Sequence, residues 1–153
     1  MDHPVWLEGL GANLAINSYR TLKFLELSIT IAGNYHDPLC GLSPELRLIA
    51  GNNVLEELKL TLVVQRDSSC QTESEDWSTF DSVLTESCAF PMLHQVSVKI
   101  WWISFYRDQI QVGAVLESLK EDKFPRLVES EAVVFNFSTE NHHGWYYCDG
   151  FQF

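Results

Sequence analysis

Few residues of this chain combine reactive side chains with a spacing that supports chemistry. The first candidates are the two histidines near the end of the chain. His142 and His143 are adjacent, and Cys148 follows them. A protein metal site usually has three or four ligands at defined spacing, and adjacent histidines cannot easily share one ion. His36 and Cys40 are a weaker candidate, because no CxxC or HExxH motif accompanies them. We therefore predict no metal site and interpret the histidine segment as a polar terminal segment.

Motifs of catalysis are also missing from the sequence. No GxSxG, P-loop or complete GxGxxG is present, since Gly9-x-Gly11 lacks the third glycine. Glu73, Glu75 and Asp76 resemble paired carboxylates, but they lie in a long polar stretch. Acid–base catalysis needs a carboxylate that is held and partly buried, so we interpret these three as solvated charges. We predict a protein that is not an enzyme and has no catalytic or cofactor-binding residue.

The two adjacent tryptophans are more informative. They end the stretch 90–102, in which apolar and polar residues alternate as in a half-buried strand. This alternation places Trp102 on the inward face and Trp101 on the outward face with Ser97 and Lys99. An outward tryptophan is a typical anchor of an interface, although a flanking loop could equally cover it. Both interpretations stay open at this point.

The same strand carries a pattern that recurs along the chain. Leu93-x-x-Val96-x-Val98 matches Leu22-x-x-Leu25-x-Leu27 and Leu55-x-x-Leu58-x-Leu60, and Leu127 opens a weaker copy. The opening leucines are 33, 38 and 34 residues apart. Self-similarity with a period of about 20–50 residues is typical of stacked repeats.

Each period contains one helical segment and one strand. Ser43 followed by Pro44 predicts the start of one helix, and Asp76 is the predicted cap of another. A third helix is expected between Gln109 and Lys123, and a poorly formed one within residues 1–21, where glycines interrupt the pattern. The predicted strands cover about 22–31, 57–64, 93–101 and a part of 131–137.

The register of the fourth strand has two solutions. Continuing the leucine pattern puts Ala132 and Val134 inward, whereas local alternation favours Val133, Phe135 and Phe137. A slip of one residue exchanges the two faces of a strand, so only one of these sets can reach the core.

The predicted fold is therefore an α/β solenoid fragment of about four parallel strands with helices on the outer face. We expect a single domain over residues 1–153, with repeats at approximately 1–33, 34–64, 65–104 and 105–138 and a tail at 139–153. The tail is rich in aromatic residues, and we expect it to fold back over the last repeat, because stacked repeats need covered ends.

The repeated leucines, with the Phe-Pro-x-Leu sequence at 90–93 and again at 124–127, resemble leucine-rich repeats. The resemblance is strongest to the irregular repeats in the C-terminal part of fungal F-box proteins, and it spans roughly residues 20–137. The repeats are longer than usual, the asparagine or cysteine that normally follows the strand is missing, and no F-box precedes them. The resemblance implies the substrate-recognition portion of an F-box-type ubiquitin ligase component.

Composition narrows the possible partners. The net charge of −11 argues against nucleic acid, which requires clustered cations, and against an anionic membrane surface. No apolar run reaches the ~18 residues of a membrane span, and no secretory signal is visible, so we expect a cytoplasmic or nuclear protein with four free thiols.

The function expected from these patterns is non-enzymatic binding of a protein partner. The expected binding surface is the concave, outward side of the strands, formed by Glu26, Ser28, Thr30, Lys59, Thr61, Ser97, Lys99 and Trp101. One alternative is a small-ligand or carbohydrate site built from Trp101, Tyr106, Trp145 and Tyr146. A metal-dependent enzyme that uses the histidine tail is the third and weakest hypothesis.

Overall fold

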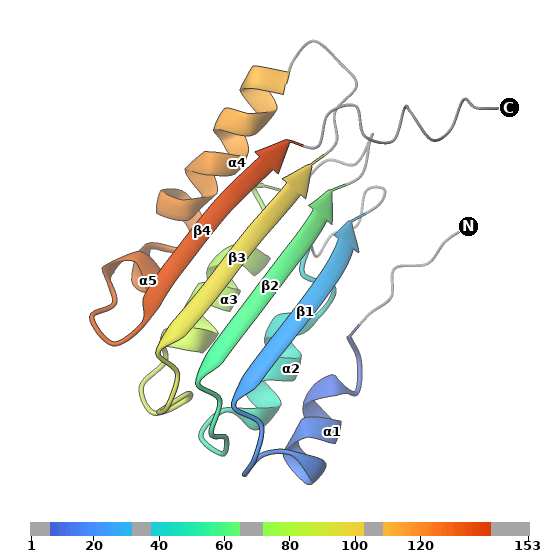
Figure 1. Ribbon diagram of the computed structural model, residues 1–153, viewed down its shortest axis with the longest axis vertical. Helices are drawn as coiled ribbons and strands as arrows, with labels where there is room; N and C mark the ends of the chain where they lie inside the picture. Colours follow the sequence, from blue (N-terminus) through green and yellow to red (C-terminus); the bar gives the residue numbers. More distant parts are fainter. Residues whose placement is uncertain (1–6, 32–37, 65–71, 103–108, 142–153) are drawn as a thin grey trace, which may run out of the picture.

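The computed structural model describes residues 7–31, 38–64, 72–102 and 109–141. Helices and strands alternate along these segments, as the repeat pattern predicts (Figure 1). The elements are α1 (Leu10–Asn17), β1 (Phe24–Ile31), α2 (Leu42–Ile49), β2 (Glu57–Val64), α3 (Glu75–Thr85), β3 (Gln95–Trp102), α4 (Gln109–Lys123), α5 (Pro125–Glu129) and β4 (Val134–Asn141).

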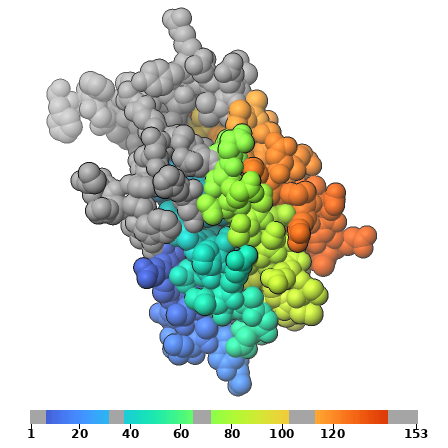
Figure 2. All heavy atoms as spheres, turned by 180° about the vertical axis from the view of Figure 1, so that it is seen from behind, coloured from blue at the N-terminus to red at the C-terminus, as the bar shows by residue number. Residues whose placement is uncertain are grey.

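The four strands form one parallel sheet in the order β1-β2-β3-β4. Their pairing is in register throughout, so that Leu25, Leu58, Val96 and Phe135 lie in one row across the sheet. The helices lie behind the sheet in Figure 1, and the view in Figure 2 is from their side. The predicted α/β fold, with four parallel strands and helices on one face, is confirmed, and neighbouring strands in the chain are neighbours in the sheet, as stacking requires.

The core lies between the sheet and the helices. The inward residues of the two central strands are almost completely buried, and the opening leucines Leu55, Leu93 and Leu127 are buried with them. Burying such a side chain fully contributes about 1.5–3 kcal/mol. Phe124, which is also fully buried, meets the rings of Trp77 and Phe80 of α3 edge to face. The leucine pattern therefore marks the core of every repeat.

The register of β4 follows local alternation, and the alternative with Ala132 and Val134 inward is wrong. Phe135 and Phe137 face the helices, where their ring centroids lie 5.4 and 5.9 Å from that of Phe124. Val134 is 63% exposed on the opposite face. Two aromatic side chains bury far more apolar surface than an alanine and a valine, so the register that turns them inward is the more stable one.

Two helix starts differ from the sequence prediction. Ser74, not Asp76, caps α3, because its hydroxyl oxygen accepts the N–H of Asp76 at 3.2 Å. Gly41 occupies the cap position of α2 with φ of 79°, and Ser43 is buried inside the first turn. That φ lies in the left-handed region, which glycine adopts without steric cost.

Two carboxylates join helices of neighbouring repeats. Glu45 of α2 accepts the N–H groups of Gly9 and Gly11 at 3.1 and 2.7 Å, at the start of α1. Asp81 of α3 accepts those of Arg126 and Leu127 at 3.1 and 2.8 Å, at the start of α5. Both carboxylates satisfy N–H groups that a helix start leaves without intrahelical partners.

Burial raises the pKa of the Asp81 carboxyl, and the two backbone N–H groups and the positive charge of Arg126 oppose that shift. The side chain is only 2% exposed. Loss of hydration disfavours the charged form of a buried carboxyl, and here it outweighs the hydrogen bonds.

Several sequence expectations fall outside the described residues. They include the covering role of the tail and all statements on His36, Tyr106, His142, His143 and Cys148. Within the described residues, Cys88 is an exposed free thiol. A search of those same residues finds no helix that has both the length and the apolar character for crossing a membrane.

Candidate functional site

The sheet face opposite the helices is the candidate site, and we call it the open face. It faces the viewer in Figure 1, where no helix lies in front of the strands. All eight residues predicted for the binding surface lie on it, since their positions alternate with the buried positions of β1, β2 and β3. These residues are Glu26, Ser28, Thr30, Lys59, Thr61, Ser97, Lys99 and Trp101.

The register aligns these side chains in rows across the strands. Glu26, Lys59 and Ser97 occupy one row, and Ser28, Thr61 and Lys99 occupy the next. In the third row, Val63 stands between Thr30 and Trp101. Aligned positions on neighbouring parallel strands are about 4.8 Å apart, so the predicted residues form one continuous surface.

The open face also contains residues that the sequence prediction did not include. Phe24, Glu57 and Gln95 extend the central surface toward the start of the strands, and Val63 completes a row. The whole of β4 was missed, because the choice between its two registers had been left open. Its residues on this face are Val134, Asn136, Ser138 and Glu140.

A charged and aromatic cluster lies where β3 meets β4. The ammonium group of Lys99 is 3.2 Å from the Glu140 carboxylate, and both side chains are partly exposed. The same ammonium group lies 5.5 Å from the centre of the Trp101 ring, within the range of a cation–π interaction. Trp101 is half-buried. Lys99 thus contacts both the carboxylate of Glu140 and the aromatic ring of Trp101.

The rest of the open face is low in relief. Ser28, Thr61 and Ser97 have small side chains, so a partner can come close to the strands at these positions. A hollow of about 50 Å³ lies between Phe24, Glu57, Lys59, Gln95 and Ser97. It has room for one or two water molecules, each of which occupies about 30 Å³, and not for an organic ligand.

Lys59 is a second cation at the centre of this surface. It is exposed on β2, directly between Glu26 of β1 and Ser97 of β3. Among the described residues, no carboxylate lies within ion-pair distance of its ammonium group. Lys59 can therefore receive a carboxylate from a partner without losing an ion pair to any of the described residues.

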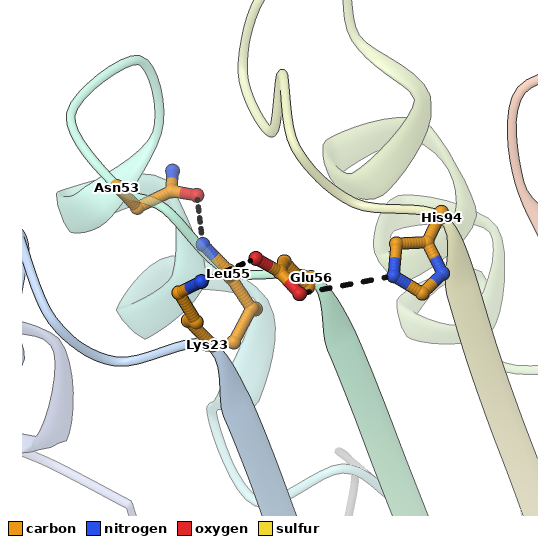
Figure 3. A network of polar contacts seen from close by, with 5 residues as sticks. All are labelled: Lys23, Asn53, Leu55, Glu56 and His94. Atoms are coloured by element: carbon orange, nitrogen blue, oxygen red, sulfur yellow. Dashed lines mark hydrogen bonds and ion pairs between the residues drawn. The ribbon is translucent and has the colours of Figure 1, made fainter.

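A polar network borders the open face at the N-terminal ends of the strands (Figure 3). Lys23, Glu56 and His94 each precede a strand, and Glu56 binds Lys23 at 3.0 Å and approaches His94 to 4.0 Å. Their main chains connect as well, since the carbonyl of Glu56 accepts the N–H of His94 at 3.0 Å. Residues at equivalent positions of three successive repeats thus connect the starts of β1, β2 and β3.

Asn53 connects the repeats behind this network. Its amide nitrogen donates to the carbonyls of Ile49 at 2.8 Å and of Ala89 at 2.9 Å, while its oxygen accepts the N–H of Leu55 (Figure 3). Asn53 is not among the residues that the sequence prediction singled out. An asparagine that precedes a strand by a few residues was the available signal.

The other candidates for chemistry are metal ligands, a carboxyl with a raised pKa and the aromatic residues. No three His, Cys, Asp or Glu side chains among them gather as metal ligands. Asp81, which has a raised pKa, lies between the helices and not on the open face. Of the aromatic residues in the carbohydrate hypothesis, Trp101 is described, and Tyr106, Trp145 and Tyr146 lie outside the described residues.

Comparison of the chain with protein-family models, with curated proteins and with solved structures returns no match. The chemistry and arrangement of the open face are therefore the features that point to a function.

Proposed function

We propose that this protein is a non-enzymatic interaction module that binds a protein partner across the open face. The observation that carries the proposal is the contrast between the two faces of one sheet. One face is packed against the helices, while the other presents aligned, mostly polar side chains together with Lys99 and Trp101. A surface of this kind is stable without a partner and can still be desolvated by one.

The size of the open face suits part of a protein interface. Four strands of eight residues cover roughly 500 Å², from a strand spacing of ~4.8 Å and a rise of ~3.3 Å per residue. A standard interface buries about 800 Å² on each partner. We therefore expect the partner to cover most of the open face and to contact residues beyond its edges.

Trp101 and Lys99 are the expected anchors. Tryptophan and charged groups at the centre of a desolvated interface often contribute 2 kcal/mol or more, while the small residues around them mainly exclude water. Lys99 is held in place by Glu140 and the Trp101 ring, so less side-chain entropy is lost on binding. A carboxylate of the partner can approach the exposed Lys59 at the same time.

The resemblance to leucine-rich repeats of F-box proteins supports a more specific proposal. In it, the open face is the substrate-recognition surface of an F-box-type ubiquitin ligase component that works in the cytoplasm or nucleus. The stack of helix-and-strand repeats with one parallel sheet fits that role. The bound partner would then be the protein that is to be ubiquitinated.

Site-specific photo-crosslinking tests the proposed surface. A photoreactive phenylalanine analogue replaces Thr61 at the centre of the open face or, as a matched control, the exposed Glu117 on α4. In an extract of the source cell, we expect a discrete cross-linked protein at Thr61 and none at Glu117. Equal products at both positions, or a product at Glu117 alone, would place the partner elsewhere.

A glycan-binding screen of the same protein separates the carbohydrate hypothesis. We expect no glycan to bind in a manner that depends on Trp101. A glycan whose binding is lost in Trp101→Ala, together with no cross-link at Thr61, would reverse the order of the two hypotheses.

A further inference from the structure

A groove of about 520 Å³ lies away from the open face, where α3 and α5 end. Its apolar lining comes from Leu84 of α3, from the loop before β3 and from the turn before β4. The apolar lining residues are Leu84, Phe90, Pro91, Leu93, Ala132 and Val133. The segments 85–93 (yellow-green) and 125–133 (orange to red) come close to one another in Figure 2. Met92, which lies between the lining residues Pro91 and Leu93, is 52% exposed and adds apolar surface beside the groove.

The rim of the groove is predominantly negative. Glu86 and Glu129 line it and are exposed, and Glu131 is exposed between two lining residues. The last turn of α3 contains no basic residue, and α5 ends at Glu129, so two helix C-termini meet at the groove. Each helix C-terminus adds partial negative charge from its unpaired carbonyls. Arg126 is the opposing charge among the lining residues.

We propose that this groove is a second docking site, which binds an extended protein segment with an apolar side chain next to a lysine or arginine. The apolar side chain occupies the floor beside Phe90 and Leu93, and the cation lies between Glu86 and Glu129. Charge complementarity selects this partner, since the rim is acidic and the net charge of −11 steers basic segments toward the protein. The site is separate from the open face and does not depend on it.

The size and lining of the groove suit a short peptide segment. Its volume of about 520 Å³ lies within the 300–1,000 Å³ of typical ligand pockets, and both apolar and polar residues line it. Ser130 is already engaged, since its hydroxyl oxygen accepts the N–H of Val133 at 3.1 Å. The carboxylates of Glu86 and Glu129 form no ion pair within the described residues, so a ligand cation displaces no partner among those residues.

Selection from a phage-displayed library of random twelve-residue peptides on the folded full chain tests this inference. We expect the enriched peptides to combine lysine or arginine with aromatic or aliphatic residues. Four variants then locate their binding. Ala132→Trp fills the groove from an exposed position, and Ala114→Trp makes the same change at an exposed position of α4. Glu86→Gln with Glu129→Gln removes the rim charge, and Glu117→Gln with Glu121→Gln removes equal charge from α4.

We expect Ala132→Trp to abolish capture of the enriched peptides and the two rim substitutions to weaken it by about two- to fivefold per charge, the range of exposed ion pairs. Both α4 controls should bind like the unmodified protein, and Arg126→Gln should bind more tightly, because it removes a repulsive charge. Equal losses in the α4 controls would show charge attraction without a site and overturn the proposal. Enriched acidic peptides that are lost in Arg126→Gln, peptides that still bind Ala132→Trp, or no enrichment at all would overturn it as well. Thr61, where the open face is tested, does not line the groove. The result of the peptide selection is therefore independent of whether the open face binds a partner.

Discussion

The ammonium group of Lys99 in β3 lies 3.2 Å from the carboxylate of Glu140 in β4, across the C-terminal half of the open face. This ion pair connects the third and fourth repeats on the side of the sheet that no helix covers. Because Lys99 also lies over the Trp101 ring, its position is fixed from two sides. The pair is therefore suited to organise a binding surface more than to hold the fold together.

Removing either partner of this pair should change stability only slightly. The side chains are 38% and 46% exposed, and exposed ion pairs contribute about 0.2–1 kcal/mol. We expect Glu140→Gln to lower the free energy of unfolding by no more than about 0.5 kcal/mol. A double-mutant cycle with Lys99→Ala, measured by urea unfolding at low and high salt, checks this. A coupling above about 2 kcal/mol that resists salt would show a structural role instead.

Asp81 should make stability depend on pH in a defined direction. Its folded-state pKa is raised above 3.8, so its contribution is fully present below 3.8 and declines as the pH rises through the folded-state pKa. Asp81→Asn lacks this titration and has only one acceptor oxygen for the two N–H groups of α5. We expect the variant to be about 1–3 kcal/mol less stable.

The pH dependence of that difference is the sharper test of Asp81. The free energy of unfolding of the unmodified protein and of Asp81→Asn is measured at several pH values between about 3 and 7. The contributions of the other carboxylates cancel in the difference, because both proteins contain them. The stability difference should shrink as the pH rises above 3.8. A difference that grows over this range would mean that the pKa of Asp81 is lowered in the folded protein.

Gly11 should resist any side chain. A Cβ at this position would meet the main-chain carbonyl of Glu45 well inside van der Waals contact, so α1 would have to move away from α2. We expect Gly11→Ala to cost about 1–3 kcal/mol, the range of overpacked positions, although alanine favours helices. Ala12→Ser, at an exposed position of the same helix, is the control and should stay within about 0.5 kcal/mol in thermal unfolding. A Gly11→Ala protein as stable as the control would refute the close packing of α1 on α2.

The register of β4 can be tested by two truncations of adjacent residues. Phe135→Ala removes a ring that packs on Phe124, and we expect a loss of about 2 kcal/mol or more. Val134→Ala removes two methyl groups from a side chain that is 63% exposed, and we expect at most about 0.5 kcal/mol. Urea unfolding of both variants measures these losses. A larger loss for Val134→Ala than for Phe135→Ala would support the register in which Ala132 and Val134 face inward.

Much of this architecture is visible in the sequence because one signal recurs. The alternation Val96, Val98, Ile100 and its counterparts predict the strands and their buried faces, and the spacing of the opening leucines predicts their parallel order. Any residue of the right parity on β1 to β3 could therefore be assigned to the open face. That is why Lys59, Thr61 and Lys99 were placed together correctly.

What escaped prediction depends on contacts between distant segments. The register of β4 was decided by Phe124, a residue that the alternation pattern does not contain. The role of Asp81 depends on its hydrogen bond to the start of α5, which is distant in the sequence. The role of Asn53 likewise depends on its hydrogen bond to Ala89 in the next repeat. The Lys99–Glu140 pair could not be predicted before β4 had a register.

The most direct measurement of the proposed function is the affinity of the protein that cross-links at Thr61, taken together with the melting temperature of each variant. Lys99→Ala and Thr61→Arg alter the open face without opening a cavity, and Lys120→Ala on α4 is the control. We predict that both open-face variants lose tenfold or more in affinity, about 1.4 kcal/mol, with melting temperatures close to that of the unmodified protein. Lys120→Ala should bind normally. Unchanged affinity in both open-face variants, or a loss that Lys120→Ala shares, would contradict the assignment of the open face as the binding surface.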